Sequence, residues 1–242
     1  MLPVVNSEFA TWQYSPIQRH QGKIGNETLT MKTSLLFLEF LLAYIFLPLF
    51  IHYGVLPNAP VPSLLLMAFV FGLVVWGDAT FDRSCLLNVP AARRKLLPVL
   101  LRSAFLCLAL GVAVWWWKPQ LLFSLIKRSP GFWALMMVIY PLFSVYPQEF
   151  LFRAYFFHRY QTLFGTEWPM IAASALSFGF VHIVLGNWIA VVLSAIGGVL
   201  FASTYRQSRS LLLVCIEHAI FGNFIFTIGL GQYFYHGNLN IQ

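Results

Sequence analysis

The sequence predicts an all-α membrane protein, a polytopic helical bundle of about seven spans. Hydrophobic residues make up 59% of the 242 positions and charged residues only 10%, and the mean hydropathy is +0.74. Soluble domains carry about 25% charged residues, so this chain lacks the polar surface that water requires. Apolar stretches near the length of a bilayer crossing recur along the chain. Backbone groups in lipid must pair within such a stretch, which makes each one a helix.

The elements follow in order from these apolar runs. Residues 1–32 are mixed and polar, so we expect a tail or a surface helix there. Segment 78–95 is polar and then basic, which predicts an exposed connection. The fourth apolar run is irregular, so we expect a broken span. Tryptophans fall at or near several span ends, as is typical of anchoring at the membrane interface. The expected spans are 34–55, 60–77, 96–117, 132–163, 168–185, 188–205 and 210–228.

The basic residues predict the orientation in the membrane. Ten Lys and Arg residues fall on the side of the N-terminus, whereas the other side has only Lys118, Lys127 and Arg128. The positive-inside rule then puts the N-terminus in the cytoplasm and, with seven spans, the C-terminus outside. The net charge of +7 is explained by cations at span ends that face lipid headgroups. No basic module of the usual kinds is present, so we expect no nucleic-acid partner.

Ionisable side chains inside the apolar runs are functional candidates, because one at a helix centre costs at least about 2.5 kcal/mol. Glu39 and Arg102 lie near span ends. We therefore expect their aliphatic side-chain carbons to stay in the apolar region while their charged groups extend to the membrane interface. The second half of the chain differs, because three successive apolar segments carry polar groups in their interiors. These segments are Pro147–Arg153, Phe178–His182 and Glu217–Asn223.

The spacing of these groups predicts contacts. Gly165-Thr166-Glu167 reads as a turn between two helices, with Glu149 and His182 each about 16 residues from it. Equal distances in an antiparallel hairpin predict that Glu149 and His182 face each other, about 24 Å from the turn. By the same count, His218 is shallower. Glu149 and Arg153 are four residues apart with the acid first, the favourable order for an ion pair.

A carboxylate beside an imidazole in a site of low dielectric constant can activate water as a general base. A second His with Asn can donate hydrogen bonds to the oxyanion of a tetrahedral intermediate. Such a set suffices for amide hydrolysis, and no GxSxG motif supports a serine hydrolase. A zinc site made by His182, His218 and one Glu is the alternative, although the chain has no HExxH motif.

At these residues the chain resembles the CPBP family of membrane proteases, which includes CAAX prenyl protease 2 and the Abi proteins. That family shows Glu-Glu-x-x-x-Arg, then Phe-x-x-x-His, then a His followed by Asn. The resemblance covers roughly residues 130–228. The matching positions here are Gln148-Glu149-x-x-x-Arg153, Phe178-x-x-x-His182, and His218 with Asn223.

The resemblance implies a glutamic-type intramembrane endopeptidase without a cofactor, acting on a hydrophobic or lipidated peptide or protein that the membrane lipid delivers. The breadth of the family leads us to expect a multi-pass protein of a bacterial inner membrane. His182 would be the partner in water activation, and His218 with Asn223 would be the oxyanion donors. The implied catalytic set is Glu149, His182, His218 and Asn223, with Gln148, Arg153, Phe178 and Glu217 in supporting roles.

Two departures from the family pattern matter for this reading. Gln148 stands where the family has its first Glu, and a Gln cannot take a proton from water. Glu149 must then act as the base, or the protein is inactive. Asn223 follows His218 by five residues where four is commoner, and Gly222 could permit a bulge that restores the geometry. Glu217 either substitutes as a base or hydrogen-bonds another helix.

Two other functions remain open at the level of sequence. A catalytically inactive relative would serve as a membrane scaffold or bind a peptide or lipid in the same pocket. An ion-coupled carrier would also use buried acids and histidines, but the chain shows no inverted repeat. We divide the chain into a polar N-terminal tail (1–32), N-terminal spans (33–128), a CPBP-like protease core (129–230) and a short C-terminal tail (231–242).

Overall fold

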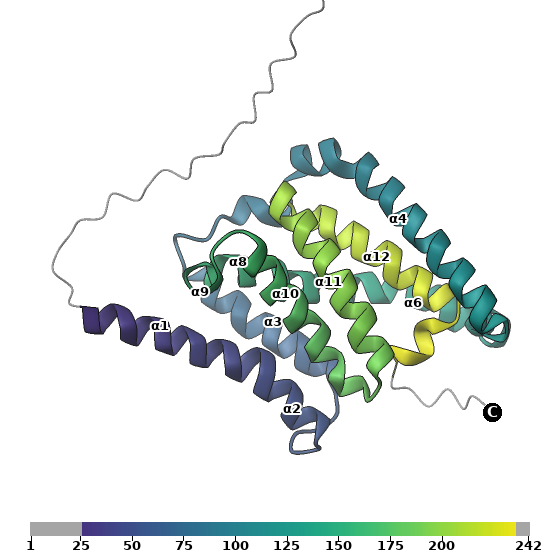
Figure 1. The fold of residues 1–242 in the computed structure, drawn as a ribbon, viewed down its shortest axis with the longest axis horizontal. Coiled ribbons are helices and arrows are strands. Elements are labelled where there is room, and N and C mark those ends of the chain that lie inside the picture. Colours follow the sequence, from purple (N-terminus) through teal and green to yellow (C-terminus); the bar gives the residue numbers. More distant parts are fainter. Residues whose placement is uncertain (1–25, 236–242) are drawn as a thin grey trace, which may run out of the picture.

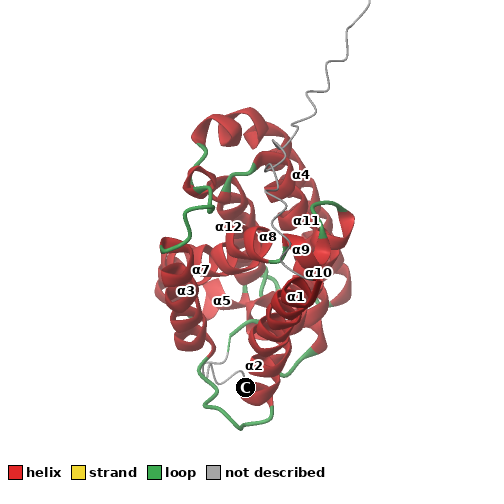
Figure 2. Ribbon diagram, turned by 90° about the vertical axis from the view of Figure 1, so that its left-hand side faces the viewer, coloured by secondary structure: helices red, strands yellow, loops and turns green. Residues whose placement is uncertain are grey.

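The computed structural model describes residues 26–235, and every regular element in this range is a helix (Figures 1 and 2). Five helical stretches are long and apolar enough to cross a membrane, and two shorter apolar helices accompany them. The predicted all-α bundle of about seven spans is therefore confirmed, and the protein is a multi-pass integral membrane protein. The five long stretches are Lys32–His52, Arg83–Trp117, Pro130–Arg159, Trp168–Leu185 and Trp188–Ser208, and the shorter ones are Pro60–Trp76 and Leu211–Thr227.

The first span is one continuous helix with a widened turn. Helix α1 (Asn26–Leu41) passes through a π-helical segment (Leu42–Phe46) into α2 (Leu47–His52). Pro48 has no backbone N–H, and the π-helical turn before it accommodates that missing donor. Part of the predicted polar tail, from residue 26 onward, is thus helical. The rest of the tail lies outside the described residues.

Helix α3 (Pro60–Trp76) is followed by a connection that is shorter than the sequence predicts. A 3₁₀ turn (Arg83–Leu86) leads into α4 (Val89–Trp117). The second half of the expected exposed connection 78–95 is therefore helical, and its basic residues 93–95 are exposed. The side chain of Asn88 accepts a hydrogen bond from the backbone N–H of Ala91, which caps the start of α4.

The loop after α3 is tied to the fourth span. The Asp78 carboxylate lies 2.8 Å from His158 Nε2 and accepts hydrogen bonds from the backbone and hydroxyl of Thr80. The hydrogen bond with His158, followed by those from Thr80, holds the pKa of the Asp78 carboxyl well below its usual value. The loop thus carries a stable carboxylate that anchors the end of the fourth span.

The fourth span is not broken as the sequence predicts. After a 3₁₀ turn (Pro119–Leu121) and α5 (Ser124–Arg128), one helical path contains α6, α7 and α8 and two π-helical segments. The π-helical turns replace the expected break, because they let the chain pass two interior prolines without leaving the helix. The parts are α6 (Pro130–Tyr140), a π segment (Pro141–Val145), α7 (Tyr146–Glu149), a second π segment (Phe150–Tyr155) and α8 (Phe156–Arg159).

Side chains of neighbouring spans satisfy backbone carbonyls of the second π segment. Tyr44 in the first span donates its hydroxyl to Leu151 O at 3.0 Å. Ser174 donates its hydroxyl to Phe152 O at 2.7 Å. Because lipid offers no alternative donor, these two contacts allow the widened turn to exist at this depth.

The last helices are α9 (Gln161–Phe164), α10 (Trp168–Val181) with a 3₁₀ turn (His182–Leu185), α11 (Trp188–Ser208), α12 (Leu211–Thr227) and a final 3₁₀ turn (Leu230–Tyr233). Helices α10 and α11 pack closely because small residues meet. A Cβ on Gly179 would lie 2.6 Å from Ala195 Cβ, and a Cβ on Gly198 would lie 2.9 Å from Ala175 Cα. Helix α12 packs against α11, α6 and α4, and α4 lies on the outer side (Figure 1).

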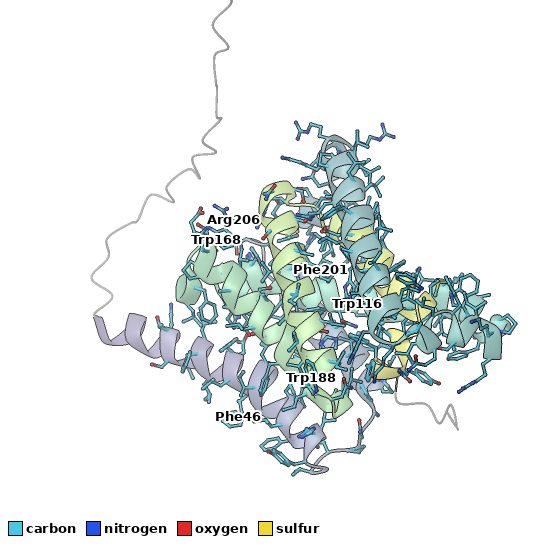
Figure 3. The ribbon with its side chains drawn as sticks, turned by 45° about the vertical axis from the view of Figure 1, so that its right-hand side comes forward. Phe46, Trp116, Trp168, Trp188, Phe201 and Arg206 are labelled. Carbon is cyan, nitrogen blue, oxygen red and sulfur yellow. The ribbon has the colours of Figure 1, made fainter. Side chains whose placement is uncertain are left out.

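The outer surface of the bundle is apolar and aromatic. Trp116, Trp168 and Trp188 are 88%, 67% and 70% exposed, whereas Phe201 is only 3% exposed (Figure 3). Exposed tryptophans at helix ends are typical of side chains that contact the lipid interface. The interior that Phe201 helps to fill is also where the polar groups of the later spans gather.

Candidate active site

A cavity of about 350 Å³ opens between the first span, α3, the fourth span and the end of α10. Most of its wall is apolar, with Leu, Ile, Val, Met, Pro and Phe side chains. The fourth span contributes three polar residues to this wall, and α10 with its 3₁₀ turn contributes a fourth. These are Tyr140, Ser144, Gln148 and His182.

Gln148 is the motif residue of the fourth span that lines this cavity. Its amide nitrogen donates to Ser144 Oγ at 2.6 Å, and its buried Oε1 accepts no hydrogen bond from any residue that the structure describes. A buried acceptor without a partner costs about 1–3 kcal/mol. The amide oxygen is therefore an unpaired acceptor in a residue that lines the cavity.

His182 lines the same cavity from the start of the 3₁₀ turn. Its Nδ1 lies 2.7 Å from the backbone carbonyl oxygen of Phe178. A carbonyl only accepts, so Nδ1 carries the hydrogen and Nε2 of the neutral ring is left as an acceptor. The spacing Phe178-x-x-x-His182 thus fixes the tautomer of the histidine through the helix backbone.

Glu149 does not line the cavity and is fully buried. Its Oε1 lies 2.6 Å from His218 Nδ1, and its Oε2 lies 3.1 Å from Arg153 Nε. The ion pair predicted between Glu149 and Arg153 is confirmed. His218 Nε2 lies 2.9 Å from Tyr140 Oη, so His218 and Tyr140 connect the carboxylate to the cavity wall.

Aromatic rings surround the buried arginine. The Arg153 guanidinium lies 4.6 Å from the Phe178 ring centre and 5.5 Å from that of Phe201. Phe178 also makes edge contacts with His182 and His218, and Phe201 stacks on His218 at 4.6 Å. Ring faces attract a desolvated cation, so the phenylalanines help to hold its charge in the membrane.

Asn223 and Gly222 occupy different environments. The Asn223 amide donates to Met137 O at 3.2 Å, and this residue is absent from the cavity wall. Gly222 packs directly against Tyr140, because a Cβ there would lie 2.4 Å from the tyrosine oxygen. The helix remains α-helical through both residues, so the bulge that Gly222 was expected to permit is not present.

Glu217 belongs to a separate polar cluster. It is fully buried, forms an ion pair with Arg102, and accepts a hydrogen bond from Thr204 Oγ1 at 2.7 Å. Arg102 also donates to Thr204 Oγ1 at 2.7 Å. Glu217 could have been a substitute base or a hydrogen-bond partner of another helix. Its contacts fit the second role, because they join it to other helices. The expectation that Arg102 simply reaches the interface is wrong, because it pairs across α4, α11 and α12.

Glu39 also differs from its expected role. Arg159 pairs with it at 2.6 Å, and the hydroxyls of Tyr155 and Tyr160 donate to the same carboxylate at 2.8 and 3.0 Å. The residue therefore joins the first and fourth spans instead of merely reaching the interface. The sequence did not indicate this contact, since more than a hundred residues separate the partners.

The prediction that Glu149 and His182 lie at equal depth is wrong, and the reason can be identified. No hydrogen bond joins Glu149 to His182, and the contact that forms is the one with His218. The fourth span ends at Arg159, and α9 separates it from the turn, so Glu149 lies only ten residues from its span end. His218 lies nine residues after Arg209, which gives the same depth. His182 is 14 residues into its span, about 6 Å deeper.

Sequence reasoning missed Tyr140 and Ser144. Tyr140, Ser144 and Gln148 recur every four residues, which on a helix places polar groups along one face. This period was the available signal, although a tyrosine near a span end also fits an interface anchor. Among the described residues, no group of three or more His, Cys, Asp or Glu side chains is arranged to hold a metal ion.

Sequence comparison identifies the part of the chain that carries this site. Residues 130–224 match the family described as Type II CAAX prenyl endopeptidase Rce1-like. The matched segment runs from α6 into α12 and includes all eight residues singled out from the sequence. No curated protein and no solved structure matches the chain significantly. Residues 130–224 are therefore a domain of the Rce1-like type II CAAX prenyl endopeptidase (CPBP) family, carried by a multi-pass membrane protein.

Proposed function

We propose that this protein is an intramembrane endopeptidase that hydrolyses a peptide bond of a membrane-delivered peptide or protein held in the cavity. The observation that carries the proposal is the pairing of Gln148 and His182. Each comes from a different span, both line the same apolar cavity, and each has a hydrogen-bond acceptor that no described donor of the protein uses. Two such acceptors suit a water molecule, which has two hydrogens to donate.

In this proposal His182 Nε2 removes the proton of the attacking water. Neutral imidazole is a competent base near neutral pH, whereas an amide is not. Gln148 Oε1 orients the water by accepting its second hydrogen. Glu149 acts indirectly, because its carboxylate is buried against Arg153 and His218 and does not line the cavity. This assignment replaces the role of direct base that the sequence motif implied for Glu149.

The wall of the cavity supports an apolar substrate. Leu47, Ile51, Leu64, Met67 and Val184 lie among its lining residues. The matched family is one of prenyl endopeptidases, so a lipidated C-terminal segment is the substrate class we propose. The basic residues favour a cytoplasmic N-terminus, and a bacterial inner membrane is the location we propose.

The test uses the purified full chain in liposomes and a farnesylated peptide that ends in a CAAX sequence and carries a quenched fluorophore. Loss of a general base costs about 100- to 10,000-fold, so His182→Ala is expected to lower kcat/KM by that factor. His52→Ala is the matched control, because His52 is exposed and outside the cavity. Equal loss in both variants, or no loss in His182→Ala, would contradict the assignment.

Gln148 itself favours a second candidate function, in which the protein binds a lipidated peptide without cutting it. A site that lacks a carboxylate on the cavity wall can bind and still leave water unactivated. Gln148→Glu distinguishes the two functions. If the wild-type protein binds the peptide without cleaving it and Gln148→Glu starts cleavage, the binding function is correct. If the wild type cleaves and Gln148→Glu only changes the pH profile, the endopeptidase proposal holds.

A further inference from the structure

We propose that Tyr140 is a catalytic residue whose hydroxyl donates a hydrogen bond to the carbonyl oxygen of the scissile bond as negative charge develops there. The inference rests on the proposed hydrolysis and deepens it by naming the oxyanion donor. The sequence motifs give this role to His218 and Asn223, and neither residue lines the cavity. Tyr140 does line it.

The position of the hydroxyl is the first observation. Tyr140 Oη lies 2.9 Å from His218 Nε2, and His218 Nδ1 lies 2.6 Å from Glu149 Oε1. Only one imidazole ring and two hydrogen bonds separate the hydroxyl from the carboxylate. The His218 ring thus links the tyrosine to Glu149, although their Cα atoms are more than two turns apart on the helix. Tyr140 also lines the same cavity as Gln148 and His182, which hold the proposed water.

The space for the ring is the second observation. Gly222 lies four residues after His218, one helical turn on, and faces the tyrosine. A Cβ at Gly222 would lie 2.2 Å from Tyr140 Cε1 and 2.4 Å from its oxygen. The hydroxyl thus occupies the space that a side chain at residue 222 would need. The ring also makes an edge contact with Phe226 at 5.3 Å.

The hydrogen-bond chemistry explains how the hydroxyl serves two partners. With Nδ1 facing the Glu149 carboxylate, His218 carries its hydrogen on Nδ1, and Nε2 accepts from the Tyr140 hydroxyl. When His182 takes the water proton, the hydroxide oxygen bonds to the carbonyl carbon and the carbonyl oxygen becomes negative. The tyrosine hydrogen then rotates from Nε2 to that oxygen. A hydrogen bond to a charged group is about twice as strong as a neutral one, so the exchange is favourable.

Asn223 is unsuited to this role. Its amide donates to the backbone of Met137, and it stands about 100° around the helix from Gly222. His218 is also unsuited, because both ring nitrogens already face partners. Tyr140 and Ser144 are then the hydroxyls of the fourth span on the cavity wall, and only Tyr140 is linked to His218.

The experiment compares two ligands of the full chain in liposomes. One is the farnesylated CAAX peptide amide, and the other is the same peptide with a tetrahedral phosphonate in place of the scissile bond. Removing an oxyanion donor costs about 100- to 1,000-fold. Tyr140→Phe is therefore expected to lower kcat and weaken phosphonate binding by that factor, with KM and amide binding unchanged. The pH profile stays that of the wild type, because His182 remains the base.

Two matched substitutions separate catalysis from packing. Tyr146→Phe removes a hydroxyl from an exposed tyrosine of the same span, and no loss of phosphonate binding is expected. Gly222→Ala displaces the Tyr140 ring and is expected to reproduce Tyr140→Phe, whereas Gly72→Ala adds a methyl group to open space. If Tyr140→Phe weakens the amide and the phosphonate equally, the tyrosine only shapes the cavity and the proposal is overturned.

The two proposals fail in distinguishable ways. If the wild type cleaves the peptide and Tyr140→Phe retains full kcat, the endopeptidase stands and the role of Tyr140 falls. If the wild type does not cleave, the hydrolysis falls and the catalytic role of Tyr140 falls with it, even where Tyr140→Phe abolishes a preference for the phosphonate. If the wild type does not cleave the peptide and binds the phosphonate no more tightly than the amide, both proposals are overturned.

Discussion

Phe178 lies at the centre of the polar cluster and serves each of its members differently. Its carbonyl orients His182, its ring face contacts the Arg153 guanidinium, and its edge meets the His218 ring. One residue thus holds two histidines and an arginine in a fixed relation. These contacts explain in physical terms why Phe178, an apolar residue, belongs to a motif whose other members are polar or ionisable.

The Glu149–Arg153 pair leads to a prediction about stability. Arg153→Met leaves the Glu149 carboxylate buried with only His218, and loss of one partner of a buried pair costs about 3–5 kcal/mol. We expect a large drop in the free energy of unfolding, measured in detergent by tryptophan fluorescence. The double variant Glu149→Gln with Arg153→Met should recover part of that loss, because no unpaired charge remains.

Arg94→Met is the control for this pair, since Arg94 is exposed at the start of α4. A drop of equal size in Arg94→Met would mean that the loss comes from the general charge of the protein. Failure of the double variant to recover stability would contradict the view that the uncompensated carboxylate is the source of the cost.

The sequence was informative about which residues form the site and less so about what each one faces. Gln148, Glu149, Arg153 and His182 stood out because polar groups in apolar helices are costly. The direction in which each of these side chains points depends on two π-helical turns. No local sequence pattern predicts those turns. Tyr140 was missed because aromatic rings are common in membrane helices and give no specific signal of a site.

At the scale of elements, the contact between α10 and α11 makes the sharpest prediction. Gly179 faces Ala195 so closely that an added methyl group would force the helices apart. Gly179→Ala is expected to lower the free energy of unfolding by about 1–3 kcal/mol, the usual cost of overpacking. Thermal unfolding in detergent measures the change. Gly72→Ala is the control, and an equal shift in both variants would contradict the argument.

The helices themselves were predictable because length and apolarity are strong signals. Expected spans 60–77, 188–205 and 210–228 fall on α3, α11 and α12. Depth within the bundle was not predictable to the same degree. Helix α9 leaves the path of the fourth span, so counting from the turn placed Glu149 several residues too deep. A short helix of this kind has too few residues to leave its own sequence pattern.

For the whole molecule, the charge count makes a prediction about orientation. With the N-terminus in the cytoplasm, residue 94 lies in the cytoplasm and residue 127 lies outside. Arg94→Cys and Lys127→Cys would be made in a chain whose three native cysteines are replaced by alanine. In intact cells, a maleimide that cannot cross membranes should label Lys127→Cys only. Labelling of Arg94→Cys alone would invert the orientation.

The hydrogen bond from Tyr44 to Leu151 has a consequence for the transfer of the matched segment between genes. The matched segment starts at residue 130, yet one carbonyl of its second π segment accepts a hydrogen bond from a hydroxyl of the first span. The cavity also takes part of its wall from the first span and α3. The segment that sequence comparison recognises is therefore completed by contacts from the first span and α3. A gene fusion that moved this segment alone would have to supply a replacement for Tyr44.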